Sequence, residues 1–399
     1  MTARWAATLG PGGDTVLSAT GLWPLLGLLA DAAAGPARDE LADALRVPAD
    51  RAPELARELL AHLARVPRVG SALGLWVRPR VALREEWAAG LPEATLGVLG
   101  PDPAESGRRL DAWAAERTGG LIPAVPVEVG ARTELVLASA QAVRTTWLRP
   151  FEESVMFPER GPWAAPDDDM RPLRSLRRRT AVLDRVGVAE TGIGPLTVLK
   201  VLGGTGVDVH LLLGPEDADR SAVLTSGLAV LAGRHPLVPG TLLPLGEPGP
   251  GLSVALARSS DREPSLSVTT SPFALAAEHD LTGLAEVFGL STAMDASRGH
   301  FPGVADDPPL AVDDARQTAV ARFDAKGFEA GSVTAVAMMA AGIPARPYTV
   351  RHVGLDIDRP FGFLTVHRSS RLVLTAGWVA EPVPYVDEDE DEDEDTLHA

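Results

Sequence analysis

Apolar residues recur at helical spacing in the first third of the chain and form alternating or continuous runs in the rest. Residues 52–66 show the helical pattern most clearly, because Leu55, Leu59 and Leu63 fall on one face. Pro36 stands just before a second helix, at residues 37–45, in a first-turn position that favours proline. The same spacing predicts further helices at residues 22–34, 84–91 and 105–117.

Strands are predicted where apolar residues alternate or run on between turn residues. Residues 196–202 and 207–213 flank a glycine-rich turn and predict a buried hairpin. The other predicted strands are residues 71–77, 93–99, 134–143, 253–258, 265–269, 320–323, 361–367 and 372–379. Because the helices come early and the strands late, the pattern predicts an α+β fold.

Residues 328–343 form an unusual segment between two predicted strands. Loops usually carry Pro, Gly, Asn and Asp as turn residues, but this one consists mostly of small residues and contains no proline. Strand alternation places Phe328, Ala330, Ser332 and Thr334 on one face, and all of them except Phe328 are small. Since a central strand cannot hold proline, we expect a strand that lies outside a sheet and is able to join one.

Short motifs in a fixed order connect this segment to the rest of the chain. Residues 325–334, AKGFEAGSVT, are similar to the hinge consensus E-x-G-T-E-A-A-x-A-T. Residues 135–151 are similar to L-V-N-A-x-x-F-K-G-x-W-x-x-P-F, and residues 359–363 to K/H-P-F-x-F. The remaining matches are residues 18–22 for F-S-P-x-S-I, then Thr118, Gly120 and Ile122 for T-x-G-K-I, then Gly377 and Pro382 for F-x-G-x-V-x-x-P. Over nearly the whole chain, these motifs resemble those of the serpins, protease inhibitors with an exposed reactive loop.

The serpin resemblance implies a single domain over residues 1–386, followed by an acidic, disordered tail at 387–399. The implied fold packs helices on a large mixed central sheet, with two smaller sheets and the reactive loop. A serpin is not an enzyme: a serine or cysteine endopeptidase forms an acyl-enzyme on the loop, and the cleaved loop inserts into the central sheet with the protease attached. Two alternatives stay open: a non-inhibitory binding or carrier protein of the same fold, and an unrelated enzyme or structural protein.

The resemblance also assigns candidate site residues. The hinge comprises Ala325, Lys326, Gly327, Phe328, Glu329 and Ala330; the sheet-opening region comprises Ser18, Gly21, Ser139 and Gln317; Trp147 marks the breach, where the loop enters the sheet. Counting from the hinge gives Ala341–Gly342 as the reactive bond, whereas counting back from Pro360 gives a bond near Thr349. We prefer the hinge-side count because the sheet sets the inserted length. Arg346 is a weaker candidate because Pro347 follows it and disfavours trypsin-like cleavage.

Two hinge residues depart from the family pattern. Phe328 stands where inhibitory members carry Thr or Ser, and Ala325 replaces the usual Glu. Overpacking a core position typically costs about 1–3 kcal/mol, so Phe328 is expected to slow insertion and to favour substrate-like cleavage. The sheet-opening region usually carries Ser, Ser, Asn and His, of which only Ser18 is kept, so a different polar network is expected there.

The net charge of −17 is concentrated at the end of the chain. Residues 387–395 are all acidic, which leaves about −8 for the rest. Such a block stays solvated; the alternative is a handle for a basic partner or for the arginine-rich segment 171–179 of the same chain. One arginine cluster in an acidic protein gives little support for nucleic acid. The expected partner of this monomer is a serine protease of the elastase or subtilisin type, which prefers small residues.

Several classes of site lack their residues. The chain has no cysteine, and its histidines form no H-E-x-x-H motif and no i, i+4 pair, so no metal or other cofactor is expected. The longest apolar run, at residues 22–30, is short of the roughly 20 residues that span a membrane. The absence of a signal peptide predicts a cytoplasmic protein; a start further upstream, suggested by the short first helix, would allow an extracellular one. The excess of arginine over lysine is expected of a bacterial, actinobacterial-like member.

Overall fold

The structure is a computed structural model that describes residues 1–93, 95–125, 129–130, 133–159, 161–165, 171–305, 307–328 and 347–386. The α-helices in these ranges are α1 (Thr2–Ala6), α2 (Ala19–Ala30), α3 (Gly35–Leu45), α4 (Ala52–Leu63), α5 (Glu85–Ala89), α6 (Pro103–Thr118), α7 (Arg220–Leu231) and α8 (Ala285–Phe288), with 3₁₀ turns η1 (Leu183–Arg185) and η2 (Thr282–Leu284). Local chemistry sets several of their starts. Ser18 caps α2 by accepting the Gly21 N–H, and Asp102 caps α6 by accepting the Ala104 N–H.

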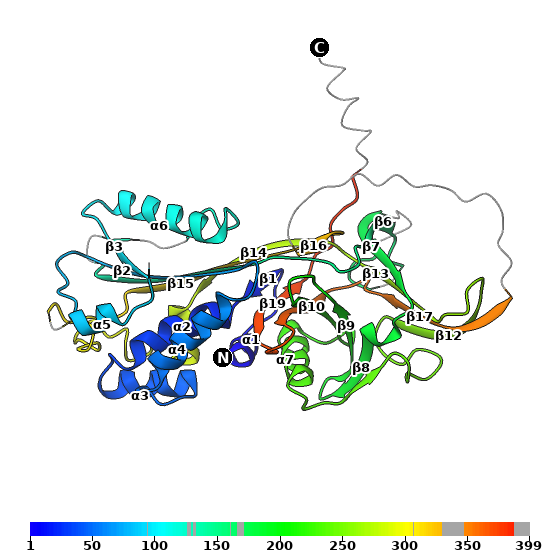
Figure 1. Ribbon diagram of the computed structural model, residues 1–399, viewed down its shortest axis with the longest axis horizontal. Helices are drawn as coiled ribbons and strands as arrows, with labels where there is room; N and C mark the ends of the chain where they lie inside the picture. The colour runs from blue at the N-terminus through cyan, green and yellow to red at the C-terminus, as the bar shows by residue number, and fades with distance from the viewer. Residues whose placement is uncertain are drawn as a thin grey trace, which may run out of the picture.

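A five-stranded mixed sheet runs through the left half of the molecule in Figure 1 and reaches its centre. Its strand order is β14 (Phe273–Asp280), β15 (Asp314–Phe323), β4 (Leu135–Val143), β2 (Val69–Val77) and β3 (Leu96–Val98). Figure 1 shows α6 above one face of this sheet and α2, α3 and α4 below the other. Because helices cover both faces, β4 is buried at every position, and all its residues except Gln141 are apolar or small.

Two further sheets build the other half of the molecule. One has seven strands in the order β1 (Thr15–Leu17), β19 (Val373–Val379), β18 (Phe361–His367), β10 (Val207–Leu213), β9 (Gly194–Val201), β8 (Val186–Thr191) and β11 (Leu237–Pro239). The other has five strands in the order β12 (Leu252–Ser259), β17 (Tyr348–Asp356), β13 (Ser265–Thr270), β7 (Leu173–Thr180) and β6 (Glu152–Met156). A two-stranded pair joins β5 (Thr145–Thr146) to β16 (Gly327–Phe328).

Strand β17 lies between two strands that are neighbours in the sequence. It pairs antiparallel with β12 at eight positions and parallel with β13 at five. Directly after residues 329–346, the chain therefore enters a strand that is paired along both edges. The last described residues lie beside β7, where the Arg174 N–H donates to the Val383 carbonyl oxygen at 2.9 Å.

Most elements that the hydrophobic pattern predicts are present. The predicted helix at residues 52–66 is α4, and the predicted hairpin is β9 with β10, paired antiparallel. The strand predicted at 320–323 is only the end of β15, because the polar residues Asp314, Arg316 and Gln317 hide its beginning. The pattern does not predict β17, whose Arg351 and His352 interrupt its apolar alternation. Residues 387–399 lie outside the described part, so the boundary of the tail stays a prediction.

Candidate functional site

The central sheet has a seam at which two neighbouring strands run in the same direction. β15 pairs with β4 in parallel at six positions that end at Ala319 and Gln141, whereas β14 and β2 are antiparallel to these two strands. Both strands continue beyond this last pair, β15 to Phe323 and β4 to Val143, but they no longer pair with each other. A pocket of about 250 Å³ opens there, with Val143, Val320 and Phe328 in its wall. The strands therefore separate at the end where the chain leaves β15 for the hinge.

A buried polar network crosses this seam. Gln317 of β15 donates from Nε2 to Ser139 Oγ of β4 at 3.0 Å and to the Ser18 carbonyl oxygen at 2.8 Å. Its Oε1 accepts the Ser18 N–H at 2.8 Å, and the three residues are buried. Gly21 packs against the network, since a Cβ there would lie 3.3 Å from Ser18 Oγ. The structure thus brings together the four residues assigned to the sheet-opening region.

The sequence does not single out two further residues of this network, nor a histidine on the neighbouring strand. Thr20 Oγ1 donates to Gln141 Oε1 at 3.1 Å, and the Ser18 hydroxyl also bonds to that oxygen. His279 of β14 lies opposite Gln317, and its Nε2 donates to the Val16 carbonyl oxygen at 2.7 Å. Burial lowers the pKa of His279, which favours the neutral ring. Strand alternation could have predicted Gln141, because it follows Ser139 by two residues and therefore lies on the same face of the strand.

The hinge leaves β15 in a tight turn built on Asp324. Its Oδ1 accepts the N–H groups of Lys326 and Gly327, both at 2.9 Å. Aspartate at the first and glycine at the fourth position are typical of such a turn. Trp147 contacts the turn through two hydrogen bonds. Its indole N–H donates to the Asp324 carbonyl oxygen at 2.8 Å, and its backbone N–H donates to the Lys326 carbonyl oxygen at 2.9 Å. The residue assigned to the breach therefore contacts the hinge directly.

Phe328 is already inside the protein. With Gly327 it forms β16, which pairs antiparallel with Thr145–Thr146 of β5. A Cβ on Gly327 would collide with the Thr145 carbonyl oxygen, so glycine permits this close approach. Phe328 is 1% exposed, and its ring centroid lies 6.2 Å from that of Phe363 and 6.4 Å from that of Phe273. The expectation that the exposed segment begins at Phe328 is therefore wrong, because the chain is paired and buried up to this residue.

An aromatic cluster ties the hinge to the rest of the core. Phe323, at the end of β15, stacks on Phe273 with centroids 5.4 Å apart, and Phe273 stacks on Phe363 at 4.8 Å. Trp147 lies 4.8 Å from Phe323 on the side of the turn. Phe151 also contacts Phe323, at 5.6 Å, and its N–H donates to the carbonyl oxygen of hinge residue 325 at 2.7 Å. The hinge is thus fixed by backbone bonds on one side and by aromatic packing on the other.

Comparison with known families agrees with this geometry. The model of the serpin (serine protease inhibitor) family matches residues 4–160 and 254–382. The chain belongs to the serpin family. Two relatives from Oryza sativa subsp. japonica, putative serpin-Z6C and putative serpin-Z8, are each 28% identical to it over 96% of this serpin and 94% of their own length.

Solved structures show the same fold. Human thyroxine-binding globulin complexed with thyroxine has a TM-score of 0.71 at 15% identity, with 96% of this serpin and 95% of that chain covered. A serpin from the trematode Schistosoma haematobium has a TM-score of 0.70 at 16% identity, covering 96% and 98%. Native protease nexin-1 with heparin also reaches 0.70, at 17% identity, covering 96% and 97%.

Part of the predicted site falls outside the described residues. Glu329 and Ala330 of the hinge and the predicted reactive bond Ala341–Gly342 lie in residues 329–346, which the structure does not describe. The alternative bond near Thr349 lies in the described part and inside β17, where Thr349 pairs with Arg258 of β12. A protease needs an extended strand free of other pairing, so this pairing of Thr349 argues against the count from Pro360, and the reactive bond stays a prediction.

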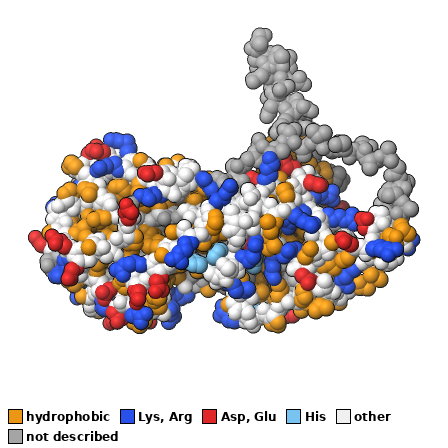
Figure 2. All heavy atoms as spheres, viewed as in Figure 1, with side chains coloured by type: hydrophobic (Ala, Val, Ile, Leu, Met, Phe, Trp, Pro, Cys, Tyr) orange, Lys and Arg blue, Asp and Glu red, His pale blue; other side chains and the backbone are white. Residues whose placement is uncertain are grey.

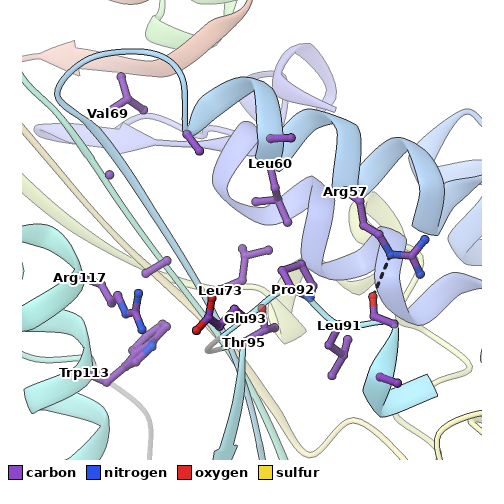
Figure 3. A pocket seen from close by; sticks show the side chains of 16 residues that line it. Arg57, Leu60, Val69, Leu73, Leu91, Pro92, Glu93, Thr95, Trp113 and Arg117 are labelled. Carbon is purple, nitrogen blue, oxygen red and sulfur yellow. Dashed lines mark hydrogen bonds between the residues drawn. The ribbon is translucent and has the colours of Figure 1, made fainter. Parts of the chain in front are cut away.

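A wide cleft lies away from the hinge (Figure 3). It has a volume of about 760 Å³ between α4, β2 and α6. Figure 3 shows Leu60 on the α4 side, Trp113 and Arg117 on the α6 side and Leu73 between them. The described residues of its wall include no cluster of nucleophilic or acid–base groups that would suggest catalysis.

The described residues give no separate sign of a cofactor site. Among them, no group of three or more His, Asp or Glu side chains is placed to hold a metal ion. None of the helices in the described ranges is long and apolar enough to cross a membrane.

Proposed function

We propose that this serpin inhibits serine endopeptidases, or cysteine endopeptidases, as a suicide substrate whose cleaved loop inserts at the seam between β15 and β4. One observation carries the proposal: the hinge is already paired with β5, at the open end of a parallel seam. A single strand that enters there is antiparallel to both neighbours, which converts the seam into a continuous antiparallel array. Roughly a dozen new ladder hydrogen bonds at about 1 kcal/mol each supply on the order of 10 kcal/mol.

The existing pairs set the register of insertion. Gly327 lies opposite Thr146 and Phe328 opposite Thr145. Continued along β4, this register places Ala330 opposite Val143, at the pocket of about 250 Å³. The small side chain of Ala330 suits that position, and Phe328 need not move. We infer that Phe328 is adapted to the hinge and does not obstruct it, contrary to the expectation from its size.

The same register supports a role for the sheet-opening residues. It places Ser332 opposite Gln141 and Thr334 opposite Ser139, and opposite residues of an antiparallel pair point to the same face. Insertion breaks the bond between Gln317 and Ser139. The two incoming hydroxyl groups then supply partners for buried polar atoms, which would otherwise cost about 1–3 kcal/mol each.

We infer that the reactive bond is Ala341–Gly342 and that the target is an elastase- or subtilisin-like protease. The small residues around this bond suit such enzymes, and the pairing of Thr349 in β17 favours the hinge-side count. The excess of arginine suits a bacterial, actinobacterial-like source. Action as a monomer, without a cofactor, and a cytoplasmic location, or an extracellular one with an upstream start, remain proposals.

A protease panel tests this function. The protein is incubated with elastase- and subtilisin-like enzymes, and the products are separated in SDS and analysed by mass spectrometry. We expect an SDS-stable complex and a cut after Ala341. The variant Ser332→Pro should be cut at the same bond without forming the complex, because a central strand cannot hold proline; Ser332→Ala should keep the complex. Cleavage by every protease without a complex would favour the non-inhibitory binding or carrier protein, and a primary cut after Arg346 or Arg351 would rule out the bond.

A further inference from the structure

Three arginines carry positive charge at the end of β7: Arg178 contacts Arg149, and Arg185 is near enough for its charge to act on Arg178. Arg149, Arg178 and Arg185 are called the arginine trio below. Arg178 donates from Nη1 to the Arg149 carbonyl oxygen at 3.0 Å, and its guanidinium carbon lies 4.2 Å from the ring centroid of Phe151. Arg149 reaches the Thr180 hydroxyl at 3.5 Å. In the part of the chain that the structure describes, none of the trio forms an ion pair.

The charge of the trio is poorly compensated. The Nε atom of Arg178 is buried and has no hydrogen-bond partner in the described structure. Burial, followed by the positive charges of Arg185 and Arg149, lowers the pKa of Arg178 to about 10. The nearby Asp184 carboxylate is engaged elsewhere, since it accepts the N–H and the hydroxyl of Thr241 at 3.0 and 2.8 Å. An anion beside the trio would relieve the repulsion between the guanidinium groups.

The end of the described chain lies on the same strand. Leu173 of β7 pairs with Pro384, and the Tyr385 N–H donates to the Pro172 carbonyl oxygen at 3.0 Å. The acidic residues 387–395 follow directly after Val386. Figure 2 shows Lys and Arg side chains spread over the half of the molecule that carries β6, β7 and β13.

We propose that the acidic run at residues 387–395 docks on the arginine trio of its own chain. The tail is long enough to reach the trio. Pro172 and Arg178 are six residues apart along a strand, which is about 20 Å at 3.3 Å per residue. Nine extended residues reach up to about 30 Å, so the first of them can turn the chain back along β7 and the later ones reach the trio. A block of like charges repels itself in solution, and pairing with the trio reduces that repulsion as well.

Docking would act on the hinge through one side chain. Phe151 carries the Arg178 guanidinium on its ring and donates its N–H to the Ala325 carbonyl oxygen. An anion that holds Arg178 in place therefore stabilises Phe151, which directly precedes β6, and its hydrogen bond to the hinge residue Ala325. A sulfated polysaccharide or another polyanion would compete with the tail for the same arginines.

The decisive experiment separates the tail from its surface while keeping the full chain. In one variant, every acidic residue of 387–395 is replaced by its amide counterpart, and a labelled peptide of residues 387–399 is titrated in by fluorescence anisotropy. We expect binding in low salt that is lost in about 1 M salt, where the Debye length is about 3 Å. Adding Arg149→Ser and Arg185→Ser to the variant should weaken binding at least tenfold, since each substitution removes a charged donor to the tail carboxylates. Arg108→Ser with Arg109→Ser, on α6, is the matched control and should change nothing.

A competition arm identifies the natural occupant. A sulfated oligosaccharide should bind the amide-tail variant about tenfold more tightly than the unaltered chain, because a tethered tail competes at an effective concentration near the millimolar range. Three results would overturn the proposal. They are no peptide binding in low salt, equal loss of binding in the α6 control, and oligosaccharide binding at the trio without any peptide binding, which would assign the site to an external polyanion. None of these readouts depends on protease inhibition, so each is independent of the proposed function.

Discussion

Phe328 holds the start of the hinge through contacts that a threonine cannot make. It is packed against Phe273 and Phe363, which come from strands far apart in the sequence. In this intact form of the protein, its backbone is also paired with that of Thr145. The bulk that looks unfavourable in the sequence is therefore accommodated before any cleavage takes place.

Replacing Phe328 with threonine tests this role. Truncation of a buried Phe to Ala costs about 3–5 kcal/mol, and Phe328→Thr is expected to lower the melting temperature of the intact protein through a loss of similar size. Because the side chain stays seated after insertion, the rise in melting temperature on loop cleavage should not increase. Thermal melts of intact and nicked protein, wild type beside Phe328→Thr, measure both quantities. A larger cleavage-induced rise in the variant, together with more stable protease complex, would show that Phe328 does obstruct insertion.

Sequence motifs predicted the individual site residues better than they predicted the surroundings of those residues. Ser18, Ser139 and Gln317 stand in family positions, and the structure brings them within hydrogen-bonding distance. The burial of the Phe328 side chain was not predictable from the sequence. It packs against Phe273 and Phe363, and these two residues come close to each other only in the folded chain. A consensus compares one position at a time and contains no information on that pocket.

At the scale of the elements, the proposed function makes β17 the strand that decides whether an uncleaved loop can insert. An inserted strand runs from the hinge away from β17, so the intact loop would have to return over the same distance to Tyr348. The residues at 329–346 are too few for both directions along a strand the length of β15. Uncleaved insertion therefore requires β17 to leave its slot and give up its pairs with both β12 and β13.

Proline substitution in β12 tests this lock. Val254 exchanges backbone hydrogen bonds with Gly246 on its outer side, so by alternation the Ala255 N–H points to β17 and the Leu256 N–H points away. Ala255→Pro removes a bond that holds β17, whereas Leu256→Pro is the matched control. On mild heating, Ala255→Pro is expected to convert at least tenfold faster to a form whose uncleaved loop resists proteolysis. Equal conversion rates for the two variants would show that β12 does not restrain β17.

Elements with a strong periodic pattern were predictable, and those defined by tertiary pairing were not. α4 and β4 carry enough regularly spaced apolar residues to be identified from the sequence alone. β7 carries Arg174 and the consecutive arginines 177–179, shows no apolar alternation, and was interpreted as a basic cluster. Its burial comes from β13 and β6 on its two edges, which no local pattern records.

At the scale of the whole molecule, buried histidines make stability depend on pH. Burial and the nearby Lys200 lower the pKa of His210, on the central strand β10, from 6.5 to about 4. The folded protein therefore binds fewer protons than the unfolded chain between these values. The contribution of His210 is complete above pH 6.5 and is lost as the pH falls toward 4. Burial raises the pKa values of Asp314 and Asp358, and their contributions have the opposite sign.

Urea unfolding at two pH values measures this contribution. Between neutral pH and pH 5, His210 alone should remove about 2 kcal/mol from the free energy of unfolding of the wild type. Over the same pH interval, the free energy of unfolding of His210→Gln is expected to fall by about 2 kcal/mol less than that of the wild type, whatever the stability of the variant at neutral pH. His235→Gln, in the loop after α7, serves as the control. An identical pH dependence in His210→Gln and the wild type would contradict the assignment.

The position of β17 between β12 and β13 also dictates an order of assembly. β12 and β13 are joined by the short connection 260–264, and two antiparallel strands so joined form a hairpin readily. In the native sheet they must stay one strand apart until β17 arrives from near the end of the chain. A growing or refolding chain therefore passes through a stage in which this hairpin can close prematurely and has to reopen, a kinetic trap of the kind common in chains of this length. The loop that would engage a protease is accordingly fixed at both ends only in the last steps of folding.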